Sequence, residues 1–365
     1  MGASQDGDAL LRLRDVVKHF PVGQRRVGAT ADLVHAVDGV SLEVRRGETL
    51  GLVGETGCGK STLARCATRL LALTSGRVVF DGHDITALSR RQLRPFRREF
   101  QMVFQDPYGS LNPHRRVGSI IGDPLTVHGL ADGSAGRRRR VQEAMELVGL
   151  NPEHYNRYPA EFSGGQRQRI GVARALVLRP KLLVCDEPVS ALDVSIRAQI
   201  INLLADLQRE LDLTYLFISH DLSVVRQVCD RVAVMYLGKL AEVAPVADLY
   251  RRPRHPYVAA LLSAVPVPDP DLSDRRQRII LAGEVPTPVH PPAGCRFHPR
   301  CPKARRRCVD QAPELVPRGG DEARHVTACH FPVEPGDDLA LPHPPIDQPG
   351  QDAGDDLAPV AGGGR

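Results

Sequence analysis

The residues with the clearest capacity for chemistry lie in the segment GETGCGKST. Gly54, Gly59, Lys60 and Ser61 match G-x-x-x-x-G-K-[ST], the pattern of a phosphate-binding loop. In such a loop the glycines let backbone N–H groups point at phosphate oxygens, and the following helix adds its positive N-terminal end. The Lys60 ammonium is predicted to reach the outer phosphates of a nucleotide, and the Ser61 hydroxyl to ligate Mg²⁺. The whole loop is predicted to bind the nucleotide: Gly54, Glu55, Thr56, Gly57, Cys58, Gly59, Lys60, Ser61 and Thr62.

Other polar residues stand at the ends of apolar runs. MVFQD contains Gln105, KLLVCDEP closes on Asp186 and Glu187, and TYLFISHDL closes on His220. A Ser-Gly-Gly-Gln turn at 163–166 directly precedes an amphipathic helix pattern, which indicates a second anion-binding helix start. These side chains could hold a metal ion, a phosphate or an attacking water.

The elements that must position these residues follow from hydrophobic patterning. The runs TLGLVG, KLLV and TYLFI have no polar alternation, which is typical of strands buried on both faces, whereas VSLEV alternates like a half-exposed strand. Helical segments such as SIRAQIINLLADLQREL separate them, so we predict an α/β domain with a mainly parallel sheet. Ligands of such sheets bind at the carboxyl ends of the strands, where Gly54, Gln105, Asp186 and His220 are expected to gather.

Composition limits the class of protein. The chain has 365 residues, 42% of them hydrophobic, and contains neither a signal-peptide pattern nor a membrane-length apolar run. Its formal charge of +5 is too small to indicate a nucleic-acid partner. Four cysteines are scattered in apolar or loop contexts, as in a reduced cytosolic protein: Cys58, Cys66, Cys185 and Cys229.

In their order along the chain, these motifs resemble the ATP-binding cassette family of transporter ATPases. The resemblance covers about residues 10–330 and adds a D-loop, SALD, at 190–193. It implies a P-loop NTPase fold: an ATPase domain over 10–250, made of a parallel-sheet core, an antiparallel β subdomain and a helical subdomain inserted at about 107–177. A small Cys-rich extension at 251–333 follows. The flanks 1–9 and 334–365 are expected to be disordered, since the tail is acidic and rich in Pro and Gly.

The resemblance also implies roles for single residues. Asp186, with Ser61 and Gln105, would hold Mg²⁺, and Gln105 would also report the nucleotide state to a membrane partner. Glu187 would orient the attacking water, and His220 would hold the γ-phosphate. Phe20 matches the aromatic residue that stacks on adenine. The signature turn of one subunit caps the phosphate loop of another, so the following are expected to contact nucleotide from across a dimer: Ser163, Gly164, Gly165, Gln166 and Asp193.

Residues after His220 narrow the resemblance. HPYVAALLSAVPVPDPDL resembles ATPases of oligopeptide and dipeptide importers. This implies an ATP-hydrolysing subunit on the cytoplasmic side of the membrane, paired with a sister ATPase and two permease subunits, and served by an extracytoplasmic solute-binding protein. Relatives also carry nickel or glutathione-like solutes.

A DNA-repair or translation ATPase is excluded because no coiled-coil insertion or second phosphate loop occurs. An iron–sulfur redox protein is the alternative from another class of protein.

Four further cysteines cluster near the C-terminus, at Cys295, Cys301, Cys308 and Cys329. Disulfides are disfavoured in a reducing cytosol, and four-cysteine zinc sites usually contain close C-x-x-C pairs, which are absent here. Soft thiolates in a looser loop suit a [4Fe-4S] cluster, as does the same cysteine pattern in the peptide-importer ATPases that the chain resembles. Zinc remains the alternative. Nearby basic residues, Arg300 among them, are expected to balance the thiolate charge or to form a solvated face.

Overall fold

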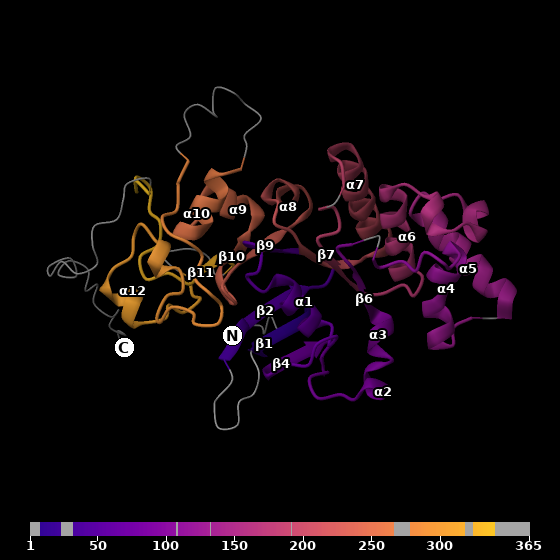
Figure 1. The fold of residues 1–365 in the computed structure, drawn as a ribbon, viewed down its shortest axis with the longest axis horizontal. Helices are drawn as coiled ribbons and strands as arrows, with labels where there is room; N and C mark the ends of the chain where they lie inside the picture. Colours follow the sequence, from indigo (N-terminus) through magenta and orange to yellow (C-terminus); the bar gives the residue numbers. More distant parts are fainter. Residues whose placement is uncertain are drawn as a thin grey trace, which may run out of the picture.

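The computed structural model of the chain describes residues 8–22, 32–106, 109–131, 133–190, 192–265, 278–317 and 324–339. Two β-sheets occupy the middle, a group of helices lies at one end, and the C-terminal region lies at the other (Figure 1). We use "C-terminal region" for the described residues from 251 to 339. The termini expected to be disordered lie outside the described residues, except for 8–9 and 334–339.

The main sheet has seven strands in the order β11-β10-β9-β3-β8-β7-β6. Neighbours from β9 to β6 run parallel, and β10 and β11 are antiparallel additions at one edge. Every residue of β3, β7 and β8 is buried, which explains their uninterrupted apolar character. The strands are β3 (Thr49–Val53), β6 (Phe100–Val103), β7 (Leu182–Asp186), β8 (Thr214–Ile218), β9 (Arg231–Tyr236), β10 (Lys239–Pro245) and β11 (Val326–Thr327).

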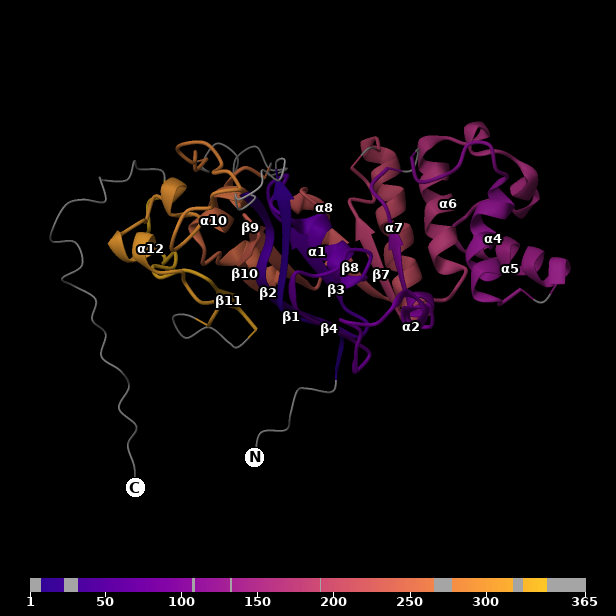
Figure 2. The same ribbon diagram turned by 60° about the horizontal axis from the view of Figure 1, so that its bottom comes forward.

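The second sheet is antiparallel, in the order β2-β1-β4-β5. Its strands are β1 (Ala9–Val22), β2 (Asp32–Arg45), β4 (Ser75–Phe80) and β5 (His83–Asp84). Along β2, Val40, Leu42 and Val44 are buried while Ser41 and Glu43 are exposed, as the alternation predicts. Helix α1 (Lys60–Ala67) contacts strands of both sheets (Figure 2). The helix that follows the phosphate loop is therefore held from two sides.

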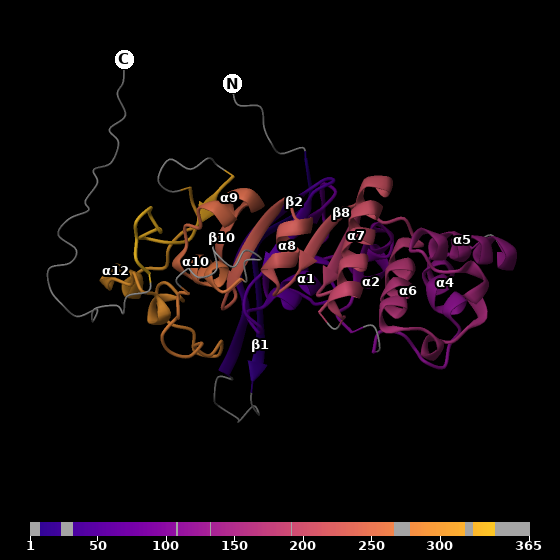
Figure 3. The same ribbon diagram turned by 90° about the horizontal axis from the view of Figure 1, so that it is seen from above.

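The helical part is inserted between β6 and β7 (Figure 3). Its main helices, α4 (Val117–His128), α5 (Gly133–Leu147) and α6 (Gly164–Leu176), pack on one another through buried Ile121, Met145 and Ile170. The remaining helices before β9 are α2 (Arg90–Leu93), α3 (Phe96–Glu99), η2 (Pro152–Asn156), η3 (Pro159–Glu161), α7 (Val194–Leu211) and α8 (Leu222–Val228). The predicted architecture, a parallel core with an antiparallel sheet and a helical insertion, is confirmed.

The C-terminal region is joined to the main sheet. It follows α9 (Val246–Arg251) and contains α10 (Pro256–Ser263), η4 (His298–Arg300) and α12 (Arg306–Asp310). It also contributes β11, whose Thr327 and Val326 pair with Glu242 and Val243 of β10. The extension expected as a separate unit after residue 250 thus supplies the edge strand of the ATPase domain's own sheet.

The buried carboxylate of Glu242 holds the C-terminal region against β10. Glu242 is fully buried and accepts hydrogen bonds from the backbone N–H groups of Arg254 and His255. His325 Nε2 lies 2.7 Å from Glu242 Oε1. The guanidinium of Arg254, also fully buried, pairs with Glu334 at 3.0 Å. Because a buried charge without partners is costly, these contacts hold the chain around residue 334 in place.

Candidate functional site

The phosphate loop runs from the end of β3 into α1. Gly54 and Gly59 adopt φ values of 152° and 108°, in the left-handed half of the backbone map. A Cβ added to Gly54 would collide with the carbonyl oxygen of Met235, and one added to Gly59 with that of Ala36. Only glycine satisfies both the backbone conformation and the close approach.

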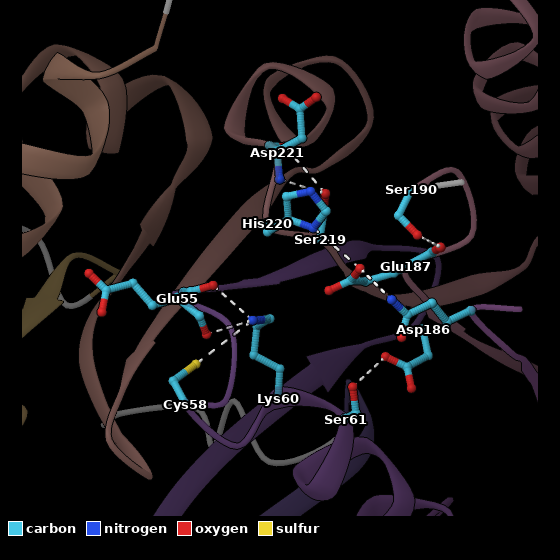
Figure 4. A network of polar contacts seen from close by, with 12 residues as sticks. Glu55, Cys58, Lys60, Ser61, Asp186, Glu187, Ser190, Ser219, His220 and Asp221 are labelled. Atoms are coloured by element: carbon cyan, nitrogen blue, oxygen red, sulfur yellow. Dashed lines mark hydrogen bonds and ion pairs between the residues drawn. The ribbon is translucent and has the colours of Figure 1, made fainter. Parts of the chain in front are cut away.

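Lys60 and Ser61 carry the functional groups of the loop (Figure 4). The Lys60 ammonium is buried and donates hydrogen bonds to the carbonyl oxygens of Gly54, at 2.8 Å, and Glu55, at 3.0 Å. The Ser61 hydroxyl donates to Asp186 Oδ1 at 2.8 Å. The loop therefore contacts the end of β7 directly, across 125 residues of sequence.

Asp186 and Glu187 stand at the carboxyl end of β7. Burial raises the pKa of Asp186, and the hydrogen bond from Ser61 opposes that shift. Glu187 has a φ of 49°, a left-handed conformation that is strained for a residue with a side chain. Ser190 stabilises this turn, because its hydroxyl donates to the Glu187 carbonyl oxygen at 3.1 Å.

The Glu187 carboxylate gathers two of the other predicted residues. Gln105 Nε2 donates to Glu187 Oε2 at 3.0 Å, and His220 Nδ1 lies 3.2 Å from the same oxygen. Glu187 is largely buried, with 14% of its side chain exposed, whereas His220 is 53% exposed. A carboxylate held between an amide and an imidazole can accept a proton from, or orient, a water molecule.

These residues line one cleft of about 820 Å³. Phe20 forms part of its wall with Val34, its register partner in β2. The ammonium of Lys18 lies 4.8 Å from the centroid of the Phe20 ring. The lining also includes Thr56, Gly57, Gly59, Lys60, Ser61, Thr62, Gln105, Glu187 and His220. An aromatic wall at one end and a phosphate loop at the other suit a nucleotide.

Other predicted residues lie elsewhere. Gly54, Glu55 and Cys58 form the back of the loop, and the Cys58 thiol is buried. Ser163 to Gln166 begin α6 in the helical part, apart from α1 (Figure 1). Asp193 precedes α7, and its side chain makes no capping hydrogen bond there. Among the described residues that line the cleft, none comes from 163–166 or is Asp193.

Two polar cleft residues received no role from the sequence. Asp106 directly follows Gln105, and Ser190 opens the SALD motif; both line the cleft. Their position beside predicted motifs is the signal that could have identified them. Ala191 of the same motif lies outside the described residues.

The four C-terminal cysteines have no disulfide in the structure. Burial raises the pKa of Cys295 to about 11 and that of Cys329 to about 12, and the charge of Cys308 adds to both shifts. Burial also raises the pKa of Cys301, and the charges of the other three thiolates add to that shift. The four thiols therefore lie within electrostatic reach of one another.

The separation of these thiols bears on which group they fit. Tetrahedral zinc with Zn–S bonds of about 2.3 Å requires sulfur atoms about 3.8 Å apart. Among the described residues, no three of the four cysteines place their sulfur atoms within 4.8 Å of one another. As placed, the thiols do not form the close set that a single zinc ion requires.

A second group of metal-ligand types consists of His19, His35 and Asp38, whose ligand atoms lie within 4.8 Å of one another. His19 Nε2 is 3.2 Å from Asp38 Oδ1. However, the other oxygen of Asp38 pairs with Arg296 and lies 3.8 Å from Lys239 Nζ. Two cations already balance the single carboxylate, so this group is an ion-pair cluster that does not favour another cation.

Comparisons with protein families agree with the family that the motifs resemble. A family model described as "ABC transporter" matches residues 37–190. A model described as "Oligopeptide/dipeptide transporter, C-terminal region" matches residues 241–308. Among the described residues, no helix has the length and apolar character needed to cross a membrane.

Several curated proteins are similar over most of their length. The oligopeptide transport ATP-binding protein AppF of Bacillus subtilis is 53% identical over 329 residues, which cover 89% of this chain and 98% of that protein. The putative oligopeptide transport ATP-binding protein YkfD of the same organism is 51% identical, covering 88% and 95%.

Solved structures agree with the fold. A dimeric post-hydrolysis state of the ATP-binding cassette MJ0796, bound to ADP and Pi, superposes with a TM-score of 0.58 at 28% identity. That match covers 65% of this chain and 98% of the other. The structure of cbiO1 from Clostridium perfringens, described as part of the ABC transporter complex cbiONQ, gives a TM-score of 0.57 at 28% identity and covers 67% of this chain and 91% of the other.

Proposed function

Because this chain belongs to the ABC transporter family, we propose that it is the ATP-binding and ATP-hydrolysing subunit of an importer for oligopeptides or dipeptides. The peptide substrate is inferred from the names of relatives that are more than half identical and from the peptide-transporter match over 241–308. The hydrolytic role is carried by one observation: Gln105 and His220 converge on Glu187 in the cleft that contains Lys60.

The chain's own residues account for the steps of hydrolysis. Lys60 and the N-terminal amides of α1 bind the phosphates, with Phe20 against the base. Glu187 orients the attacking water and accepts its proton, while His220 keeps the water in line with the γ-phosphate. Phosphoryl transfer needs mainly such positioning and charge stabilisation.

The residues near Ser61 fit a magnesium ion. Ser61 Oγ and Asp186 Oδ1 are 2.8 Å apart, and Ser61 and Gln105 line the same cleft. Oxygen ligands are those that Mg²⁺ prefers. When bound, the ion neutralises charge that develops on the phosphates. Asp186 must be ionised to serve it, and the Ser61 hydrogen bond favours that state.

The placement of α6 supports a head-to-tail pair. Ser163 and Gly165 lie outside their own chain's cleft, so they are free to meet the nucleotide of a sister ATPase. We expect the partner to be a different chain rather than a second copy. The two subunits would serve two permease chains on the cytoplasmic side of the membrane, and a solute-binding protein would deliver peptide from outside.

A second cleft, of about 630 Å³, supports permease docking. It lies between α1, β6 and the helical part and is lined by apolar Leu70, Phe104 and Pro124 together with Arg65 and Arg174. Gln105 lines both this cleft and the nucleotide cleft. A permease helix bound here would contact Gln105, the residue expected to report the nucleotide state.

For the four C-terminal cysteines we propose a structural [4Fe-4S] cluster, with zinc as the alternative. The grouping of four cysteines between residues 295 and 329 and their electrostatic influence on one another support this proposal. A bound cluster would cross-link a region that has few long helices or strands. The proposed role of the cluster is therefore structural.

Uptake measurements test the transport function. Cells lacking this chain should lose uptake of labelled di- and oligopeptides and recover it with the wild-type chain, but not with Glu187→Gln. Uptake of Ni²⁺ and of glutathione is measured in the same cells. Peptide uptake that is unchanged in the deletion strain, alongside lost Ni²⁺ or glutathione uptake, would contradict the peptide assignment.

The metal content of anaerobically purified protein tests the cysteine site. We expect brown protein with broad absorption near 400 nm and about four irons per chain. Cys301→Ser should bleach it, whereas the control Cys66→Ser, which changes a buried cysteine of α1, should not. Colourless protein with one zinc ion per chain would show that the four cysteines bind zinc and not an iron–sulfur cluster.

A further inference from the structure

The C-terminal region reaches the back of the phosphate loop at Glu55. The hydroxyl of Tyr257 accepts a hydrogen bond from the Glu55 backbone N–H at 3.0 Å. Arg300 Nη1 lies 3.1 Å from each oxygen of the Glu55 carboxylate. Tyr257 belongs to the HPY segment, which the sequence associates with peptide importers without assigning it a task, and Arg300 directly precedes Cys301.

Both contacts are sheltered from solvent. Tyr257 is fully buried, and 10% of the Arg300 side chain and 26% of the Glu55 side chain are exposed. The rings of Tyr236 and Phe297 pack on Tyr257 with centroids 4.8 and 5.4 Å away. Aromatic packing of this kind fixes the position of the hydroxyl. The contacts are therefore part of a buried, packed interface between the C-terminal region and the loop.

Glu55 transmits this contact to the catalytic side of the loop. Its carbonyl oxygen accepts a hydrogen bond from the Lys60 ammonium at 3.0 Å, while its carboxylate points away from Lys60 (Figure 4). One residue thus has its N–H and carboxylate held by the C-terminal region and its carbonyl held by the phosphate-binding lysine. A shift of Glu55 would move the groups that surround the phosphates.

The charge of Glu55 gives Arg300 a second effect. A carboxylate beside an anion-binding loop repels nucleotide phosphates unless a cation neutralises it, and the repulsion is strongest where solvent is limited. Arg300 supplies that cation from 245 residues away. Removing Arg300 alone should therefore weaken nucleotide binding more than removing Arg300 and the charge of Glu55 in the same chain.

We propose that Tyr257 and Arg300 are positioning residues of the phosphate loop, and that through Glu55 they give the C-terminal region control over nucleotide affinity. Tyr257 fixes the start of the loop, so that the following N–H groups face the cleft. Arg300 neutralises the carboxylate on the loop's outer side. This inference rests on the proposed binding of ATP at the loop.

The first test measures equilibrium binding of a fluorescent ATP analogue to Tyr257→Phe. Tyr215→Phe is the matched control, because Tyr215 is also buried and its hydroxyl donates to the Leu204 carbonyl oxygen at 3.0 Å, away from the loop. We expect affinity to fall about threefold to tenfold in Tyr257→Phe only, with similar losses of melting temperature in both variants. Equal affinities despite equal destabilisation would overturn the role of Tyr257.

The second test uses charge. Arg300→Gln should lower affinity on the order of tenfold, and adding Glu55→Gln in the same chain should restore it to within about threefold of wild type. Arg306→Gln is the control, since Arg306 pairs with Asp310 at 3.0 Å on the exposed face of α12. A purely structural Arg300 would give a double variant no better than Arg300→Gln, and that result would overturn the inference.

Lys60→Ala separates this inference from the proposed function. If wild type binds the analogue and Lys60→Ala does not, unchanged affinity in Tyr257→Phe and Arg300→Gln contradicts the positioning role alone. A wild-type chain that binds no better than Lys60→Ala contradicts both.

Discussion

Two glycine-rich turns begin helices in this chain, and they differ in what surrounds them. The turn before α1 is enclosed by distant parts of the chain: Ser61 contacts Asp186 of β7, and Glu55 contacts Arg300 of the C-terminal region. The turn before α6 is stabilised locally, by a capping box in which Ser163 and Gln166 exchange hydrogen bonds.

The two turns can therefore act in different ways. The first already gathers a lysine, a serine and two carboxylates of its own chain. The second presents backbone N–H groups at a helix start with no nucleotide cleft of its own chain beside it. A turn of the second kind contributes to binding only when another molecule brings the ligand, which is the arrangement proposed above for the sister ATPase.

The largest expected effect tests the enclosed site. Glu187→Gln should reduce ATP turnover in the assembled transporter by about a thousandfold, because the amide cannot accept the proton of the attacking water. Affinity for ATP should stay within about twofold of wild type, since Glu187 is not among the groups that bind the phosphates. Turnover is measured as phosphate release.

The control for this substitution is Glu143→Gln, on the exposed face of α5. Near-normal turnover of Glu187→Gln would contradict the hydrolytic role of this residue. It would also indicate that the pair of ATPases does not need this chain's enclosed site.

A smaller but informative effect concerns the open turn. Ser163→Arg should lower hydrolysis at the opposite nucleotide by about a hundredfold, because the long cation fills the space where Ser163 meets phosphate. Its own chain's affinity for ATP should not change. Ser89→Arg is a matched control, since Ser89 begins α2 with the same capping box and is exposed. Weaker ATP binding by the isolated Ser163→Arg chain would contradict the comparison between the two turns.

Replacing one glycine in each turn by alanine shows how much each turn contributes to the free energy of unfolding. Gly59→Ala should lower the free energy of unfolding by about 2 kcal/mol or more, because its φ of 108° and the nearby Ala36 carbonyl both exclude a Cβ. Gly165→Ala should cost about 1 kcal/mol, less than Gly59→Ala, since its Cβ would displace the Ile196 side chain, 2.5 Å away, but would meet no backbone, and alanine favours the helix. Urea denaturation measures both. Equal losses would show that the open turn is as constrained as the enclosed one.

The smallest expected effect lies in the ion pairs that join the two sheets at the amino end of β7, the end opposite to the enclosed site. Hydrogen bonds from Lys181 and Arg46 hold the pKa of Asp81 below its ordinary value of 3.8. A lowered pKa stabilises the fold above the unfolded value, and the contribution is lost as pH falls through the folded value. Asp81→Asn should therefore cost less than about 1 kcal/mol at pH 7, and the difference from wild type should shrink below pH 4.

A difference between Asp81→Asn and wild type that grows as the pH is lowered would contradict this account. It would mean that Lys181 and Arg46 do not favour the charged form of Asp81 in the folded chain.

Much of the site could be predicted because its signals are local. The phosphate loop is a continuous segment, and each of Gln105, Asp186 and His220 directly follows or ends an apolar run of strand length. Parallel strands bring their carboxyl ends to one edge, so the meeting of Gln105 and His220 at Glu187 follows from sequence patterning and sheet geometry together. Local conformation and burial were sufficient for this part of the fold.

The tertiary structure alone decided which distant groups support the loop. Arg300 was expected to balance cysteine thiolates or face solvent, and instead pairs with Glu55, 245 residues away. Tyr257 contacts the same residue across 202 residues, and the two-residue strand β11 joins the C-terminal region to the main sheet. No periodicity or spacing records such contacts, because a single hydrogen bond or ion pair leaves the local pattern of either partner unchanged, and only the folded chain brings the two together.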